Sequence, residues 1–414
     1  MKKILKTITG LFALSSVSCL LFTSFSFSQE MPKPGEVINK GNYKKYVHVF
    51  PAEFLQGFED GFVGLWKPFE VKVVETQPAS QPKGLLALSE KNRGKFTIDK
   101  DGFIAGGYDY VGLPFPGITK DDKDFVTKFM YNYNYRYSFD DFLGQELDCK
   151  KRGSESLVNV ECEVRRLSFI NRLVDAPKPT YENPVKLQSA MVINYKYPPS
   201  WRNKQTTWYK YLDQRKSDDL YAYVPTIRRI VRIDASQSST PSIEQISAPD
   251  DLYGGFNGKL HQFTYKLLGE QKVLGARENN MNVSLMKKLQ AEGGNRYLPF
   301  PSDSWELRDV CVIEILSKDP KYPQSRKVVY IDKDNLRIYY AIAWDRAGKL
   351  WKVWSTTWRT VELLPGEKTE VWSCRLSVDV QAVFGTSFTF DFRLNGNALK
   401  YSDFLPEAMI ARGM

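Results

Sequence analysis

The residue types that most often carry out catalysis are sparse in this sequence. Its 414 residues include two histidines, His48 and His261, which lie far apart and have no cysteine or carboxylate beside them at metal-ligand spacing. The Gly-x-Ser-x-Gly, His-Glu-x-x-His, Gly-x-x-x-x-Gly-Lys-Ser/Thr and Gly-x-Gly-x-x-Gly motifs are absent. We therefore expect no catalytic residues, no metal site and no cofactor.

Four pairs of adjacent aspartates could in principle act in acid–base catalysis or bind calcium. Each pair is more simply explained as a turn or a helix start, where aspartate accepts backbone hydrogen bonds. The segment Asp332-Lys333-Asp334-Asn335 lacks the spacing and the distal glutamate of a calcium loop. The four pairs are Asp121-Asp122, Asp140-Asp141, Asp218-Asp219 and Asp250-Asp251.

Aromatic side chains are the second feature with chemical potential, because many fall on strand-like segments. Tyrosine and tryptophan supply a large apolar area with a polar end, which suits the wall of a lipid-binding cavity or a platform for carbohydrate. The alternative is an ordinary sheet core. The aromatic residues that we predict to contact a ligand are Trp208, Tyr221, Tyr223, Tyr340, Trp344 and Trp354.

An arginine cluster follows these aromatics at Arg228, Arg229 and Arg232. Such donors could meet the phosphate or carboxylate head group of a ligand at the mouth of a cavity, and we take Arg229 as the candidate. The alternative is a set of arginines on an outer sheet face, paired with nearby acidic residues.

Cysteine usage indicates an oxidising compartment. Outside the N-terminal segment the chain has an even number of cysteines. Cys149 and Cys162 flank a turn-like segment between two strand-like runs, so a hairpin could bring them together as a disulfide. The alternative is a pair of free, buried thiols. For Cys311 and Cys374 the sequence offers no argument for pairing beyond parity.

The elements that must position these residues are mainly strands. Phe125, Phe129, Tyr133 and Tyr137 recur every four residues, which predicts a helix within 121–141. Beyond Phe142 the period changes to two. The candidate strands are 142–150, 157–170, 187–197, 205–214, 219–224, 227–234, 260–273, 305–317, 325–332, 336–344, 349–360 and 369–392.

The clearest predicted hairpin joins 336–344 to 349–360 through Asp345-Arg346-Ala347-Gly348, which has the residues of a tight turn. Both faces of its strands are rich in apolar residues. An antiparallel sheet of this kind needs cover on both faces, from helices, a second sheet or a ligand. The predicted helices at 121–141 and 283–290 could supply part of it.

The N-terminal residues 1–28 are typical of a cleaved secretory signal peptide. Three lysines precede an apolar run that ends in Ser26-Phe27-Ser28. A lipidated Cys19 and a retained anchor helix are the alternatives. We expect an exported protein of the periplasm that associates with the outer membrane. Its mature chain would have a mixed segment at 29–84 and one domain at 85–414. Although the net charge is +10, basic and acidic residues are interspersed, and we expect no nucleic-acid partner.

Four ordered stretches resemble signatures of the family called domain of unknown function thirteen twenty-nine (DUF1329). The segment 219–233 resembles its "Tyr-x-Pro…Arg-Arg-x-x-Arg" strand pair, and 112–116 (Gly-Leu-Pro-Phe-Pro) its "GLPFP" signature. The segment 250–258 resembles its "D-D-x-x-G-F-N-G" loop, and 330–351 its "Y-x-D-x-D…D-x-x-G-x-L-W" hairpin. An asparagine-tryptophan element expected after "GLPFP" is replaced here by Tyr131-Asn132-Tyr133, and the segment before residue 85 does not align.

This resemblance implies a mainly β (α+β) fold similar to that of the periplasmic lipoprotein carriers LolA and LolB. We expect a large, curved antiparallel sheet that forms an incomplete barrel, with a few helices covering its concave face. The resemblance also implies outer-membrane lipoprotein sorting as a related activity, and an outer-membrane β-barrel or an inner-membrane exporter of the resistance-nodulation-division type as a partner. It supplies no catalytic residue.

From the residues and the resemblance together we expect a non-enzymatic periplasmic carrier or chaperone. Its ligand would be a lipid, a lipoprotein acyl chain or another hydrophobic molecule, transferred within the cell envelope. An accessory module that docks a membrane partner without a small ligand is the alternative, and a glycan-binding envelope protein is a third class. A sizeable cavity favours the carrier, and a filled core with an exposed apolar patch favours the docking module.

Overall fold

The computed structural model describes residues 30–106, 111–183, 185–234, 239 and 246–413. The predicted signal peptide and Cys19 lie outside these residues. Among the described helices, none is both long and apolar enough to span a lipid bilayer.

One large antiparallel sheet of 14 strands dominates the molecule. Its order is β11-β10-β9-β8-β7-β5-β18-β17-β16-β15-β14-β13-β12, and short β6 pairs with β5. The strands of the first half are β5 (Asp141–Arg152), β6 (Glu155–Ser156), β7 (Val160–Ser168), β8 (Leu187–Tyr197), β9 (Gln205–Tyr211), β10 (Asp219–Val224) and β11 (Arg229–Ile233).

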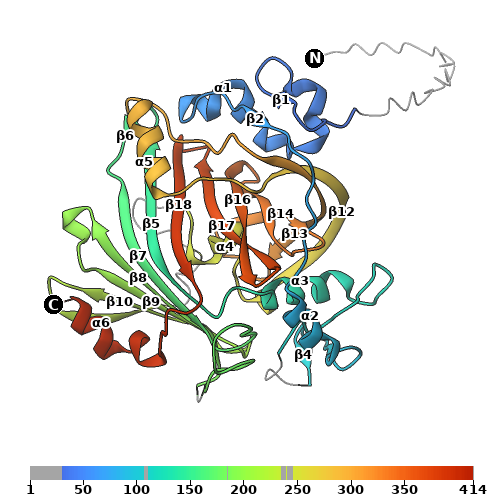
Figure 1. Ribbon diagram of the computed structural model, residues 1–414, viewed down its shortest axis with the longest axis vertical. Coiled ribbons are helices and arrows are strands. Elements are labelled where there is room, and N and C mark those ends of the chain that lie inside the picture. The colour runs from blue at the N-terminus through green and yellow to red at the C-terminus, as the bar shows by residue number, and fades with distance from the viewer. Residues whose placement is uncertain (1–29, 107–110, 184, 235–238, 240–245, 414) are drawn as a thin grey trace, which may run out of the picture.

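The remaining strands form a second run of hairpins that joins the first where β18 pairs with β5. Within the described residues the end strands β11 and β12 do not pair with each other, so the sheet is curved but open (Figure 1). The strands of this second run are β12 (Phe263–Ala276), β13 (Trp305–Ser317), β14 (Gln324–Asp332), β15 (Ile338–Asp345), β16 (Leu350–Leu364), β17 (Glu367–Asp379) and β18 (Phe384–Leu394). The predicted open antiparallel sheet is confirmed.

The hairpin predicted around Asp345 is present as β15 and β16. Its turn is held by the Asp345 carboxylate, which accepts hydrogen bonds from the backbone N–H groups of Ala347 and Lys349, each at 2.9 Å. Gly348 has a φ of +74°, which glycine adopts without steric cost. The polar turn residues and the apolar strands on either side therefore both favour this hairpin.

Helices cover the concave face of the sheet. The short helix α4 (Leu252–Gly255) lies inside the curve and packs against β15 and β16 (Figure 1). Gly255 makes this contact possible, because a Cβ atom there would lie 2.3 Å from the Cβ of Ala341. The helix α3 (Phe125–Tyr135) belongs to the apolar core on the same side and is shorter than the predicted 121–141, since β5 already begins at Asp141.

Other helices cover the opposite face. The N-terminal η1 (Tyr43–Val49), η2 (Ala52–Phe54) and α1 (Gln56–Gly64), together with α5 (Val283–Glu292), contribute to a second apolar core. Phe54 packs on Tyr340 of β15 with ring centroids 5.1 Å apart. The apolar residues on both faces of the strands are thus explained by helical cover on both sides.

Smaller elements complete the fold. In the mixed segment 29–84, Val71 and Lys72 pair with β1, and Val73 forms an isolated bridge with Trp305. The small elements are β1 (Val37–Ile38), β2 (Val71–Lys72), α2 (Lys83–Glu90), β3 (Thr97–Ile98), β4 (Ile104–Ala105), η3 (Pro199–Trp201), η5 (Pro249–Asp251), η6 (Leu260–Gln262), η7 (Tyr401–Phe404) and α6 (Pro406–Gly413).

Candidate functional site

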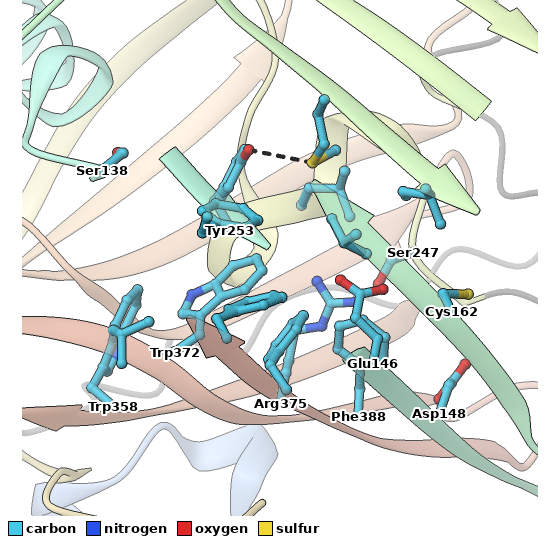
Figure 2. Close-up of a pocket in the computed structure, with 18 of the residues that line it drawn as sticks. Ser138, Glu146, Asp148, Cys162, Ser247, Tyr253, Trp358, Trp372, Arg375 and Phe388 are labelled. Carbon is cyan, nitrogen blue, oxygen red and sulfur yellow. Dashed lines mark hydrogen bonds between the residues drawn. The ribbon is translucent and has the colours of Figure 1, made fainter. Parts of the chain in front are cut away.

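A cavity of about 140 Å³ lies on the concave face of the sheet. Its walls come from β8, β7, β5, β18, β17 and β16 and from residues 136–139, and residues 246–247 and 252–253 cover it. The six strands follow one another in the sheet, so the cavity results from the curvature of a single sheet. Figure 2 shows side chains from several of these strands facing the same space.

A strip of phenylalanine side chains forms one wall. Phe388, Phe390 and Phe392 alternate along β18 and therefore face the same side. Their ring centroids lie 4.4 Å and 4.9 Å apart, and Phe392 packs on Phe142 of β5 at 4.6 Å. The strip presents a continuous apolar surface.

Aliphatic side chains form the other wall. Val160 and Val164 of β7 face the cavity together with Met191 and Ile193 of β8. Tyr253 of α4 closes over them, with its hydroxyl 3.9 Å from the Met191 sulfur (Figure 2). Most of the lining is therefore apolar, as in sites that bind hydrophobic ligands.

One end of the cavity is polar. Glu146 and Asp148 of β5 face Arg375 of β17 there (Figure 2). Burial raises the pKa of Glu146 from 4.5 to about 8, although Arg375 acts in the opposite direction. Burial likewise raises the pKa of Asp148 from 3.8 to about 7. Both carboxyl groups are thus partly or fully protonated near neutral pH.

A β-bulge places Arg375 beside an aromatic donor. In the pairing of β16 with β17, Thr357 lies opposite Cys374 and the next residue, Trp358, lies opposite Trp372, so Ser373 is an extra residue. The bulge shifts the alternation of side chains, and Trp372 and Arg375 consequently line the same cavity. The guanidinium carbon of Arg375 lies 5.9 Å from the centroid of the Trp372 ring.

The seven residues predicted from sequence to contact a ligand do not line this cavity. Two of them lie on its side of the sheet. Trp354 is fully buried and donates a hydrogen bond from Nε1 to Oγ of Ser247, a cavity residue, at 3.0 Å. Trp208 belongs to an apolar cluster with Phe142 and Met191, and its Nε1 lies 3.3 Å from Asp218.

The other five predicted residues lie elsewhere. Tyr340 packs in the opposite core, and Trp344 packs at its border under the guanidinium of Arg326. Tyr221 contacts the cluster beside the C-terminal helices, and Tyr223 is buried near α6. Arg229 is exposed on the end strand β11. A ligand role for all seven stays a prediction.

The neighbouring arginine, Arg232, is paired with an acidic residue, as the alternative interpretation of the arginine cluster expects. It forms an ion pair with Asp219 across the pairing of β10 with β11. At this position an arginine paired with an acidic residue on the sheet is the correct interpretation.

The predicted disulfide between Cys149 and Cys162 is wrong. Both are free, buried thiols in the structure. Cys149 lies in the core beside α5, with its sulfur 3.4 Å from Oε1 of Gln290, whereas Cys162 faces the cavity. The strand register places Glu146 opposite Cys162, so the two cysteines lie three positions apart and on opposite faces of the sheet. Cys311 and Cys374 are also free and buried.

The sequence interpretation missed the cavity residues Trp372, Arg375, Phe388, Phe390 and Phe392. The three phenylalanines carry a clear signal, since they alternate with polar residues. It was hidden because 369–392 was predicted as one strand, whereas the structure has a hairpin of β17 and β18.

A residue of each of the four aspartate pairs accepts a backbone hydrogen bond, as predicted. Asp140 accepts backbone hydrogen bonds from Leu173, Val174 and Asp175 at 2.7–2.8 Å. Asp122 and Asp251 hold the backbone N–H groups of residues 119 and 248. Among the described residues, no group of three or more His, Cys, Asp and Glu side chains could hold a metal ion.

The fold places this protein in the class that has an open, curved antiparallel sheet around an apolar cavity. The model of a protein family of unknown function, DUF1329, matches residues 37–407. The chain therefore belongs to the DUF1329 family, as its sequence signatures predicted. No curated protein matches the sequence.

Solved structures with a similar arrangement include three bacterial proteins. An outer membrane lipoprotein-sorting protein domain from Vibrio parahaemolyticus has 17% identity and a TM-score of 0.47, with 66% of this chain and 92% of that chain covered. A DUF1329 family protein from Desulfovibrio piger has 16% identity and a TM-score of 0.45, with 66% and 92% covered. A LolA superfamily protein from Nitrosomonas europaea has 12% identity and a TM-score of 0.40, with 67% and 94% covered.

Proposed function

We propose that this protein is a non-enzymatic carrier that binds a hydrophobic ligand, such as a lipid or an acyl chain, and transfers it within the cell envelope. The observation that supports this function is the apolar cavity between the phenylalanine strip of β18 and the aliphatic wall of β7 and β8. The signal peptide predicted at residues 1–28 favours a periplasmic location. The partner that we propose from the family resemblance is an outer-membrane β-barrel or an inner-membrane exporter.

The size of the cavity suits part of an apolar chain. An apolar cavity of about 150 Å³ in another protein stays dry and binds benzene, so a volume of 140 Å³ accommodates a comparable group. Each methylene group moved from water into such a site contributes roughly 0.8 kcal/mol. A few methylene groups give useful affinity and still permit release to an acceptor.

Mass spectrometry of the bound lipid tests the carrier function. The protein would be purified from the periplasm under gentle conditions and extracted with organic solvent. A discrete lipid in constant proportion to the protein is the expected result. An empty protein recovered with a membrane partner would instead support the docking module, for which the exposed Ile227 and Val231 near the sheet edge offer an apolar contact.

A cavity-filling variant makes this test specific. Val164→Phe adds volume to a buried side chain that faces the cavity, and the extracted lipid should decrease. Val231→Phe makes the same change at an exposed position of β11 and should leave the lipid unchanged. Equal lipid content in both variants, with thermal unfolding near that of the wild type, would contradict binding in this cavity.

A further inference from the structure

Arg375 is a buried cation with an incomplete set of partners. It is 6% exposed, and its Nε and Nη1 groups have no hydrogen-bond acceptor. Among the described residues, no carboxylate forms an ion pair with it within 4.0 Å. Burying a charge without a close partner costs several kcal/mol, so this arrangement calls for a further group.

The acidic groups nearby do not neutralise this charge as closely as an ion pair would. Glu146 and Asp148 face Arg375, but carboxyl groups in an apolar site can take up a proton and become neutral. Burial lowers the pKa of Arg375, but an arginine guanidinium keeps its proton near neutral pH because its ordinary pKa is so high. The polar end of the cavity therefore carries net positive charge when these two acids are protonated.

A second donor supports the same interpretation. The indole N–H of Trp372 is buried and has no acceptor, although indole N–H groups usually find one when buried. The bulge at Ser373 brings this donor to the cavity that Arg375 lines. Protonated Glu146 and Asp148 would add O–H donors, and one oxygen atom of Asp148 also lacks a partner.

The other arginines of the lining differ from Arg375. Arg337 donates from Nη2 to the carbonyl groups of Tyr137 and Glu370, and its Nε lies 4.0 Å from the Glu370 carboxylate. Arg136 donates from Nη1 to the carbonyl of Tyr133. The Nε groups of Arg136 and Arg337 also lack an acceptor, but each of these arginines donates hydrogen bonds from another nitrogen. Within the described lining, Arg375 is the arginine with two unpartnered nitrogens, and it lies beside the unpartnered indole of Trp372.

We propose that the ligand is an anionic amphiphile whose carboxylate or phosphate head is bound by Arg375 and Trp372, with its apolar chain along Phe388, Phe390 and Phe392. This inference rests on the proposed carrier function and names the chemical class of its ligand. A guanidinium and an indole N–H both donate, so an oxyanion satisfies the two groups at once. A cationic head would be repelled by Arg375, and an uncharged head would leave the guanidinium without a counter-ion.

Calorimetric titration of the delipidated protein with three ten-carbon probes tests this assignment. Decanoate carries a carboxylate, decyl phosphate carries a phosphate, and decan-1-ol has the same chain without charge. The wild type should bind at least one of the anionic probes on the order of tenfold more tightly than decan-1-ol. The stronger of the two anions then identifies the type of head group.

Variants separate the head group from the chain. Arg375→Met should reduce anion affinity about tenfold and leave decan-1-ol binding nearly unchanged, and Trp372→Phe should reduce it less. Arg346→Met, at an exposed position in the turn between β15 and β16, serves as the matched control and should behave as the wild type. Circular dichroism and thermal unfolding identify any variant that fails to fold, and Arg375→Lys, which keeps the charge, should restore part of the affinity.

The outcomes distinguish the two proposals. If none of the three probes binds, the carrier function itself fails in this cavity. If decan-1-ol binds as tightly as both anions, or if Arg375→Met weakens all three equally, the cavity binds apolar chains but the anionic head group is refuted. Selective loss of anion binding in Arg375→Met alone supports the assignment.

Discussion

Replacing Glu146 with glutamine should make the stability of the protein less sensitive to alkaline pH. Burial raises the pKa of Glu146 from 4.5 to about 8 in the folded protein. For an acid with a raised pKa, the stabilising contribution is fully present below the unfolded-state pKa and is lost as the pH rises through the folded-state pKa. Between pH 5 and pH 9 this single group reduces the free energy of unfolding by at most about 4 kcal/mol.

Glutamine keeps the size and hydrogen-bonding capacity of the protonated acid but cannot ionise, so Glu146→Gln removes this contribution. The charged neighbours that act on the group are Arg375 and Asp148, while burial raises the pKa values of Cys162 and Tyr195 and keeps both neutral. These neighbours are common to both proteins, so their effects largely cancel in the comparison.

Urea unfolding at pH 5 and pH 9 measures the effect. The wild type should lose more stability than Glu146→Gln over this interval, by up to about 4 kcal/mol. Glu155→Gln, at an exposed position of β6, reports the background of the substitution. If the wild type and Glu146→Gln lose the same stability within about 1 kcal/mol, the assumed burial of this carboxyl group is refuted.

Three further predictions follow from the site and the fold. Decanoate affinity should fall as the pH rises from 7 to 9, because ionised Glu146 and Asp148 repel the anion and compete for Arg375; a constant affinity would contradict this. Gly255→Ala should lower the free energy of unfolding by about 2–4 kcal/mol, since φ is +113° and the new Cβ would lie 2.3 Å from that of Ala341. Gly348→Ala, at φ +74° in open space, is the control and should cost about 1 kcal/mol. Iodoacetamide in denaturant without reductant should label both Cys149 and Cys162, because both are free thiols. If neither cysteine is labelled, the predicted disulfide is supported instead.

The sequence predicted the sheet well where the turns carry polar signals. The hairpin of β15 and β16 has Asp345 and Gly348 at its turn. The hairpin of β17 and β18 turns through Val380-Gln381-Ala382-Val383, which has no Gly, Pro or Asn. Its turn depends on Asp379, which accepts hydrogen bonds from the backbone N–H groups of residues 381 and 382. One aspartate is a weak signal, so the two strands were predicted as one.

The position of the cavity could not be predicted for a different reason. Both faces of the sheet are apolar, and the residue types do not show which face is filled by neighbouring helices. Tyr340 and Trp354 illustrate this ambiguity. Both are large aromatic residues on predicted strands, but they pack in cores on opposite faces of the sheet. The empty volume depends on the relative positions of α4, of β5 and of the hairpin of β17 and β18, and these three parts are distant from one another in sequence.

The bulge at Ser373 adds one residue to β17 without changing the face on which Trp372 and Arg375 lie. Residues on its two sides follow opposite alternation, so one inserted residue gives Trp372 and Arg375 a common direction while Cys374 keeps its place in the other core. Removing Ser373 would leave Thr357 opposite Cys374 and Trp358 opposite Trp372, so the two strands would pair without a bulge. Trp372, Cys374 and Arg375 would then alternate regularly and keep their faces, and the residues that line the cavity would tolerate this change in strand length.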